Sequence, residues 1–429
     1  MLFSDITLLN DHYEIIPHAF VATEGDTIAY VGTERPEGDF GREYDGKGRL
    51  LMSGFINAHA HSPMTLMRGY GENLKLQSWL NDRIFPFEAQ LDSNAVYWGT
   101  MLSMAESLQY GIVSTSDMYY FCEDIARAVA DSGAKANISR SLTNFTGQEP
   151  QTMESFKEMK VLYENYHNAE NGRIKIDMSL HGEYTSDPRT AKALAEYAAE
   201  IGDTIMHIHV SETASEHEEC IQRHGMSPAA YLESMGLFDV PALAAHCVYS
   251  TEDDIEIFRR KGVTVATNPV SNMKLASGIC DVSRILEKGV NVAIGTDSVA
   301  SNNSLDFFEE MKVLAIGNKV AKLQPEIMTP LQIIKAATEG GAKAQGRADC
   351  GRLAAGAKAD LIAIDIASPN MHPVHDMINN LVYSCGGRAV TLTMVDGKVL
   401  YENGEFTTID IEKTIYEAEK ATEGILKKL

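Results

Sequence analysis

Eight short runs rich in apolar and β-branched residues alternate with helix-like stretches between about residue 54 and residue 355. The runs are GFINAHAH, GIVSTSDM, KANISRSL, IKIDMSLH, TIMHIHVSE, ALAAHCV, VTVATNP and VNVAIGTD. Their carboxyl ends advance from residue 59 to residue 297 in seven steps of about 34 residues, close to the roughly 30-residue repeat of a (β/α)8 barrel. The alternation predicts parallel βα units, and eight of them predict an α/β fold of the TIM-barrel type.

The stretches between the runs carry the signals of outer helices. Residues 188–202 and 251–262 repeat their apolar positions with a helical period, begin with a proline or threonine signal and end in glycine. Such helices would cover the outside of the barrel.

The two ends of the chain read differently from its middle. Residues 1–53 and about 360–408 contain short alternating strands with Gly, Asn-Gly and Asp-Gly turns, and residues 409–429 form an amphipathic helix. Neither flank is long enough for a robust domain. We therefore expect residues 1–53 plus 360–429 to form one composite β-sandwich with a C-terminal helix, and residues 54–359 to form the barrel.

Composition narrows the classes of function. The 429 residues are 44% hydrophobic and 23% charged, with a formal charge of -23, so attraction to nucleic-acid phosphates or anionic membranes is not expected. The six cysteines have no C-x-x-C spacing, which predicts reduced thiols rather than disulfides or a zinc knuckle. No apolar run approaches the ~20 residues of a membrane helix, and we predict a cytoplasmic protein.

The first run ends in His59 and His61. Side chains two residues apart on a strand point the same way, so both imidazoles can converge on one metal ion. By itself this spacing also suits two ordinary histidines at a strand end. In a TIM barrel, however, chemistry sits at the carboxyl ends of the strands, so the other ends decide.

Those ends supply further polar side chains, namely His181, His209, Glu212, His246 and Asp297. Each has a plainer interpretation: His181 as a satisfied core histidine, Asp297 as a loop cap, and Glu212 as a first-turn helix acid. Their arrival at one rim from separate strands favours a functional site instead. His207 lies two residues deeper than His209, and we expect it to pack in a barrel layer.

Three imidazoles and one carboxylate suit a single divalent ion such as Zn²⁺ or Fe²⁺. Such an ion lowers the pKa of a bound water from 15.7 to about 7 and so generates a nucleophile at neutral pH. A general acid/base must lie within reach, and Glu212, three residues beyond His209, is the best-placed carboxylate.

The motifs GFINAHAH, HIHVSET, AAHCV and GTDSVASNN, in this order, resemble the amidohydrolase superfamily. The resemblance is strongest to its branch of 5'-methylthioadenosine/S-adenosylhomocysteine deaminases and related triazine hydrolases. It extends into the flanks, through GRLAAGAKADLIAID and VDGKVLYENGEF. It therefore covers nearly the whole chain.

The resemblance implies a mechanism. His59, His61, His209 and Asp297 would bind one metal ion, most simply zinc, with iron as the alternative. His246 would orient or polarise the attacking water, and Glu212 would move its proton to the purine nitrogen N1. Hydroxide would add at C6 and ammonia would leave. The run at 174–181 does not end in a lysine, which argues against a second, carbamate-bridged ion.

The resemblance also implies substrate contacts. The connection GYGENLKLQSWLNDRIFPFEAQLD would place Trp79 against the purine and Glu88 on the ribose hydroxyls, unless both merely belong to an amphipathic helix. His181 and Arg140 match a substrate histidine and an arginine near the carboxylate end of the substrate. A homo-oligomer is expected only by analogy with the family.

One departure bears on specificity. Members of the family that hold the amino-acid tail of S-adenosylhomocysteine tend to supply a second arginine shortly after the strand that carries Arg140. The corresponding loop here, TNFTGQEP, contains no basic residue. One arginine captures a carboxylate less well than two, so a shorter 5'-substituent is expected, as in 5'-methylthioadenosine, 5'-deoxyadenosine or adenosine. The rivals are an amidohydrolase acting on guanine, a pterin or an s-triazine, and a catalytically inactive nucleoside- or metal-binding barrel.

Overall fold

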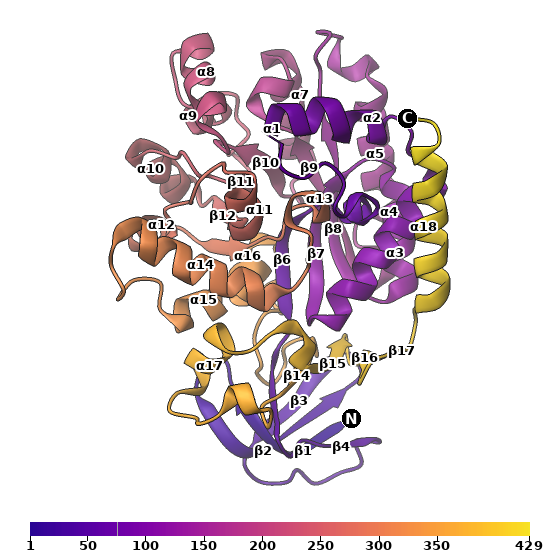
Figure 1. The fold of residues 1–429 in the computed structure, drawn as a ribbon, viewed down its shortest axis with the longest axis vertical. Helices are drawn as coiled ribbons and strands as arrows, with labels where there is room; N and C mark the ends of the chain where they lie inside the picture. The colour runs from indigo at the N-terminus through magenta and orange to yellow at the C-terminus, as the bar shows by residue number, and fades with distance from the viewer. Residues whose placement is uncertain (75) are drawn as a thin grey trace.

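The computed structural model describes residues 1–74 and 76–429. Eight parallel strands pair in chain order into a nearly closed barrel (Figure 1). They are β6 (Phe55–Ala60), β7 (Ile112–Tyr119), β8 (Lys135–Leu142), β9 (Ile174–Leu180), β10 (Met206–Val210), β11 (Ala242–His246), β12 (Thr264–Thr267) and β13 (Val292–Ile294). A parallel bridge between Ala60 and Asp297 joins the segment after β13 back to β6. The predicted barrel is confirmed, and its strands end close to the predicted positions.

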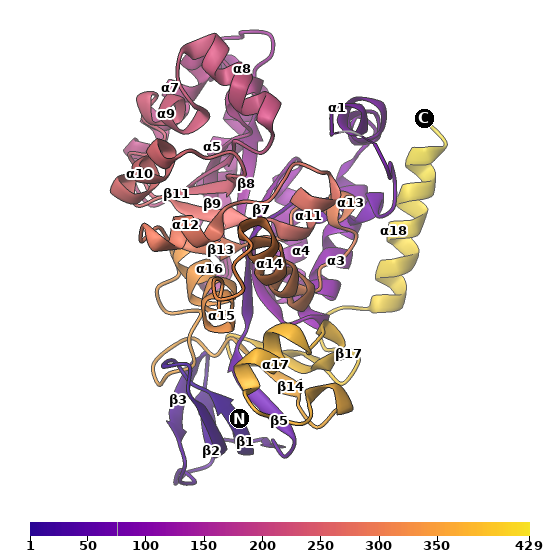
Figure 2. The same cartoon turned by 60° about the vertical axis from the view of Figure 1, so that its left-hand side comes forward.

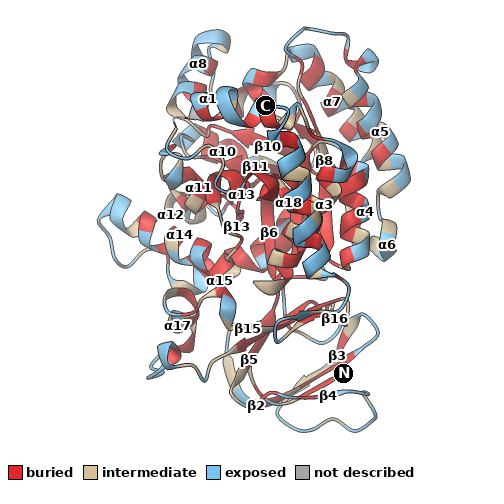
Figure 3. Cartoon of the chain, turned by 45° about the vertical axis from the view of Figure 1, so that its right-hand side comes forward, coloured by how far each residue is buried: buried red, intermediate tan, exposed pale blue. Residues whose placement is uncertain are grey.

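Helices cover the outside of the barrel. The larger ones are α3 (Ser93–Gln109), α4 (Cys122–Ser132), α5 (Glu154–Tyr166), α7 (Pro188–Ile201), α8 (Ala214–His224), α9 (Pro228–Ser234), α10 (Glu252–Lys261), α14 (Phe307–Lys322) and α15 (Pro330–Ala337). The predicted end signals act as expected: Thr251 and Asp254 form a reciprocal cap at the start of α10, and Gly262 ends it with φ +67°. Every residue of β6 and β7 is buried, as parallel strands between a core and a helical layer require (Figure 3).

The two ends of the chain share a second, mixed sheet. Its strands are β1 (Leu2–Leu9), β2 (Ile15–Glu24), β3 (Thr27–Gly32), β4 (Glu43–Asp45), β5 (Arg49–Ser53), β14 (Leu361–Asp365), β15 (Val390–Val395), β16 (Lys398–Glu402) and β17 (Glu405–Phe406). Antiparallel pairing of β5 with β14 joins the N-terminal and C-terminal strands. The sheet has its own core, in which Phe3, Ile6 and Leu392 are fully buried. The domain boundaries at residues 53/54 and 359/360 stay a prediction.

The ends of the molecule have different roles. In Figures 1 and 2 the mixed sheet lies at the bottom and α1 (Leu76–Trp79) at the top, on the side where the barrel strands end. The connection after β6 contains α1, a π-helical turn (Leu80–Ile84) and α2 (Phe85–Glu88), and its Lys75 lies outside the described residues. The C-terminal helix α18 (Ile411–Leu426) lies along α3.

All six cysteines are buried and free, and no described helix is long and apolar enough to cross a membrane.

A buried charge cluster joins the mixed sheet to the bottom of the barrel. Lys135, the first residue of β8, places its Nζ 2.5 Å from Asp360 Oδ2 and 2.6 Å from Asp396 Oδ1. The side chains of Lys135 and Asp360 are only 3% and 2% exposed. Burial disfavours the ammonium, but the two carboxylates outweigh that penalty and raise the pKa of Lys135. One cation therefore neutralises two acids that flank β14 and β15.

We expect Lys135→Ala to lower the free energy of unfolding by about 3–5 kcal/mol, because it leaves buried carboxylates without a counter-ion. Denaturant titration measures this loss. Lys157→Ala is the matched control, since its pair with Glu154 is 3.5 Å long and largely exposed, and its effect should stay within about 0.5 kcal/mol. Equal losses in the two variants would contradict a structural role for the buried cluster.

Candidate active site

The carboxyl ends of three strands and the loops that follow them bring the predicted metal ligands together. His59 belongs to β6, and His61 follows its last residue, while His209 lies on β10. Asp297 follows β13, and its backbone N–H donates to the carbonyl of His59 over 2.9 Å. The closure of the barrel thus sets the first and last strand ends side by side.

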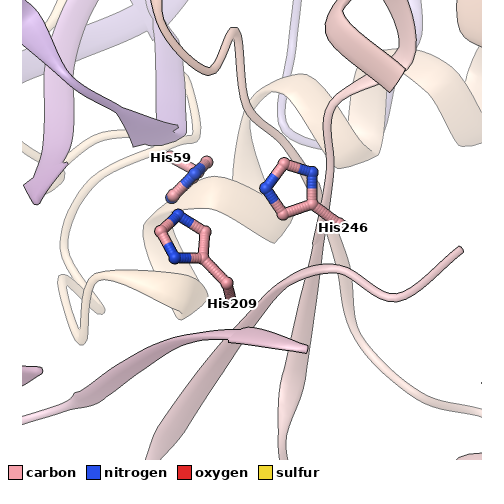
Figure 4. Close-up of side chains that lie close together, drawn as sticks. All are labelled: His59, His209 and His246. Atoms are coloured by element: carbon pink, nitrogen blue, oxygen red, sulfur yellow. The ribbon is translucent and has the colours of Figure 1, made fainter. Parts of the chain in front are cut away.

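Two overlapping groups of side chains have the geometry of a metal site. The possible ligand atoms of His59, His209 and His246 lie within 4.8 Å of one another, and so do those of His59, His61 and Asp297. Figure 4 shows the first group, with the three rings gathered around one small space. Asp297 Oδ1 lies 3.3 Å from His61 Nε2 and 3.7 Å from His59 Nε2.

The outer nitrogen of each histidine is already engaged. His61 Nδ1 and His209 Nδ1 lie 2.5 and 2.6 Å from the carbonyl oxygens of Met118 and His181. His246 Nδ1 lies 2.8 Å from Asn272 Oδ1. When Nδ1 donates outward, the lone pair of the ring is on Nε2, and Nε2 is the atom that faces the centre.

His59 shows most clearly that these residues suit a cation. Its Nδ1 lies 2.8 Å from His207 Nε2, whereas its Nε2 is buried without a hydrogen-bond partner. Burial, followed by the neighbouring imidazoles, lowers the pKa of His59 and His209 far below the usual value, so both rings are neutral. Neutral imidazoles and a carboxylate form the donor set of a divalent ion such as zinc.

Asp297 is held by a small network of hydroxyl and backbone groups. Ser271 Oγ donates to Asp297 Oδ2 over 2.5 Å, and the N–H of Ser298 donates to Oδ1 over 2.8 Å. The backbones of Asp297 and His246 are left-handed, with φ +59° and +71°. Non-glycine residues rarely adopt this conformation, and at functional sites it aims a side chain that the regular strand would direct elsewhere.

Glu212 lies beside this group, just after β10. Its Oε2 is 3.9 Å from His246 Nε2, and burial raises the pKa of its carboxyl. Glu216 accepts hydrogen bonds from the N–H groups of Ser211 and Glu212 at 2.9 and 2.7 Å, and so fixes the turn that carries Glu212. A carboxyl with a raised pKa next to a histidine is suited to accepting and returning a proton.

One cavity opens above the group. It encloses about 720 Å³ of empty space, part of it open to solvent. Of the predicted residues, its lining includes His61, Trp79, Glu88, His181, His209, Glu212, His246 and Asp297. His59 lies beneath this lining and is fully buried.

The wall of the cavity carries the predicted substrate residues. Trp79 is 6% exposed, and Glu88 accepts a hydrogen bond from the hydroxyl of Tyr119 over 2.7 Å. Burial raises the pKa of Glu88 to about 7. His181, whose pKa burial lowers to about 4, presents a neutral ring. Trp79 and Glu88 thus lie on the same cavity as the proposed metal ligands, which an amphipathic surface helix would not require.

Arg140 is the one predicted site residue that neither lines this cavity nor belongs to the two groups of possible metal ligands described above. It lies near the end of β8 and lines a neighbouring pocket, where its Nε donates to Glu158 Oε2 over 2.7 Å. Its predicted contact with a substrate carboxylate stays a prediction.

Sequence reasoning missed the groups that position the ligands. His207 was expected only to pack in a layer, yet it contacts His59 directly. The H-x-H spacing of His207 and His209 was the available signal, because both side chains point into the barrel. Asn272 and Ser271, which hold His246 and Asp297, lie on the short helix α11 (Pro269–Lys274) and carried no recognisable signal.

Comparisons with known proteins agree with this arrangement. A 5-methylthioadenosine/S-adenosylhomocysteine deaminase of Thermoanaerobacter pseudethanolicus is 37% identical over 431 residues, covering all of both chains. A 5'-deoxyadenosine deaminase of Methanosarcina mazei is 40% identical over 409 residues, covering 95% of this chain and 94% of its own. The crystal structure of an adenosine deaminase from Xanthomonas campestris with bound zinc is similar, with a TM-score of 0.92 and 29% identity, covering 99% of this chain and 98% of its own. The profile of the amidohydrolase family matches residues 50–400. The chain therefore belongs to the amidohydrolase family, as its motifs predicted.

Proposed function

We propose that the chain is a metal-dependent hydrolytic deaminase of adenosine-type nucleosides. The observation that carries the proposal is one cavity whose floor holds the metal-ligand group with Glu212 and whose wall holds Trp79 and Glu88. A protein that only binds does not need a proton-transferring carboxyl, and a free base has no ribose for Glu88. The names of the full-length relatives support 5'-methylthioadenosine, S-adenosylhomocysteine and 5'-deoxyadenosine as candidate substrates, with adenosine beside them.

His59, His61, His209 and Asp297 would hold one divalent ion, with zinc favoured over iron because the similar adenosine deaminase binds zinc. When bound, such an ion supplies a Lewis acid that lowers the pKa of a water from 15.7 to about 7. The outward hydrogen bonds of the histidines keep their Nε2 atoms available to it.

The protein's own groups then perform the transfer of protons. Glu212 accepts a proton from the attacking water and delivers it to N1 of the purine, while His246 orients that water through Nε2. The water oxygen forms a bond to C6, and its second proton passes to the exocyclic amino group. The bond from C6 to that nitrogen breaks, ammonia leaves, and the oxygen remains as the carbonyl at C6. Trp79 stacks on the purine, and Glu88 accepts hydrogen bonds from the ribose hydroxyls.

Ammonia release from a panel of substrates tests the proposal. The panel contains 5'-methylthioadenosine, 5'-deoxyadenosine, adenosine, guanine, a pterin and an s-triazine, each with native, demetallated and zinc-restored protein. We expect release from the adenosine-type nucleosides that is lost on demetallation and returns with zinc. Release only from another ring would indicate the rival amidohydrolase. No release from any compound would indicate a binding protein, and undiminished activity after demetallation would remove the metal from the mechanism.

We expect Glu212→Gln to retain its metal while kcat falls by a factor of about 10²–10⁴, because the amide cannot carry the proton. Steady-state kinetics and metal analysis on the same preparation measure the two effects. Glu218→Gln, an exposed change on the following helix, serves as the control. A Glu212→Gln enzyme with near-normal turnover would exclude this residue as the acid/base.

His207 should control how tightly the metal is held, because it fixes the ring of His59. We expect His207→Leu to weaken metal affinity about 10–100-fold, and His207→Gln, which keeps a hydrogen-bond acceptor, to weaken it less. Competition with a chelator measures affinity without reference to turnover. Equal affinity in wild type and His207→Leu would show that the contact is packing alone.

A further inference from the structure

A second pocket continues the proposed nucleoside site outward. Its described lining residues are Phe85, Glu88, Ala89, Tyr120, Phe121, Arg140 and Glu158. Phe85, Glu88 and Tyr120 also line the cavity above the metal group, so the two spaces share a wall. With the purine over the metal group and the ribose at Glu88, the 5'-substituent would enter this outer pocket.

Arg140 is the cationic residue among the described lining residues of this pocket, and its guanidinium is paired with the carboxylate of Glu158. Arg140 Nε donates to Glu158 Oε2 over 2.7 Å, and Nη1 donates to the carbonyl of Ser141 over 2.8 Å. The guanidinium also lies 5.1 Å from the centre of the Tyr120 ring. The side chain of Arg140 is 16% exposed and that of Glu158 is 51% exposed, so the carboxylate is the more exposed partner of the pair.

The acidic residues around the pair disfavour the binding of an anionic group in this pocket. Besides Arg140, the ionisable side chains among the described lining residues are two carboxyls, Glu158 and Glu88. An adjoining depression adds Glu123, Asp124 and Glu154 against Lys157, in a chain with a formal charge of -23. An anionic group would have to displace Glu158 and then lie among like charges.

A nearby arginine does not compensate for this. Arg189, on α7, donates from Nη2 to the carbonyl of Gly147 over 2.7 Å, within the loop where a second basic residue is lacking. It is paired with Asp187 at 2.9 Å and lies 3.7 Å from Glu149. In the described part of the chain it lines neither the cavity nor the outer pocket.

We propose that Glu158 determines substrate specificity by neutralising Arg140, so that the enzyme selects nucleosides with a short, uncharged 5'-substituent over those with an anionic group there. This inference rests on the proposed deaminase function and names the substrate class of that site. Glu158 acts here through Arg140 and not on the reacting atoms.

The test compares kcat/KM for three substrates in wild type and Glu158→Gln. The substrates are 5'-methylthioadenosine, which is uncharged at the 5' end, adenosine 5'-monophosphate, which is anionic, and S-adenosylhomocysteine, which is zwitterionic. Wild type should prefer 5'-methylthioadenosine. Glu158→Gln should raise the kcat/KM of each carboxylate- or phosphate-bearing substrate relative to 5'-methylthioadenosine by about tenfold, since a freed guanidinium gains a charge-assisted hydrogen bond.

Two further variants make the result specific. Glu164→Gln changes an exposed acid on the same helix α5 and should leave the ratios unchanged. The double variant Arg140→Gln with Glu158→Gln should lose the gain, because the receiving cation is gone. A gain that persists in the double variant would overturn the role of Arg140.

The remaining outcomes are equally decisive. Unchanged ratios in Glu158→Gln would overturn the inference, and a lower ratio for S-adenosylhomocysteine would show that Glu158 binds the ammonium group of the tail instead. Either result with good turnover of 5'-methylthioadenosine leaves the deaminase function intact. If wild type releases no ammonia from any of the three, nor from adenosine or 5'-deoxyadenosine, the proposed function itself fails.

Discussion

The site depends on the closure of the barrel between its first and last strands. The bridge between Ala60 and Asp297, with the hydrogen bond from Asp297 to His59, sets two segments about 240 residues apart against each other. Without that closure the histidines of β6 would have neither the carboxylate nor the other imidazoles nearby. The same contacts that close the barrel therefore also assemble the proposed metal ligands.

Around this group, a layer of hydrogen bonds does the positioning. Backbone carbonyls of Met118 and His181, the amide of Asn272 and the ring of His207 each engage one Nδ1. The histidines are thereby held with their remaining nitrogens inward, and burial keeps His59 and His209 neutral. Because these partners all belong to the protein itself, they would keep the rings in the orientation that a bound ion requires.

The two halves of the elongated site differ in electrostatic character. The inner cavity is lined by imidazoles and carboxyls whose pKa values are shifted by burial, which suits acid–base catalysis. The outer pocket contains an ion pair that is already satisfied, which suits discrimination. The chain's acidic balance acts in the same direction as Glu158, since both disfavour anionic groups at the mouth.

The sequence by itself determined the barrel, because eight buried strands at a regular spacing leave few other folds, and it located the polar residues at the strand ends from the period of the strands. It also pointed to pairing of the two chain ends, since neither flank can bury a core alone. Only the tertiary structure decided which groups support the ligands. His207 on β10 contacts His59 on β6, and Asn272 on α11 holds His246 at the end of β11, because the barrel brings these distant segments together. The left-handed backbone of Asp297 has no local signature. The pairing of Arg140 with Glu158 was likewise invisible, because a residue on β8 meets one on α5 only after the helix has packed on the barrel. Local periodicity encodes strands and faces, whereas side-chain partners depend on distances that exist only in the folded chain.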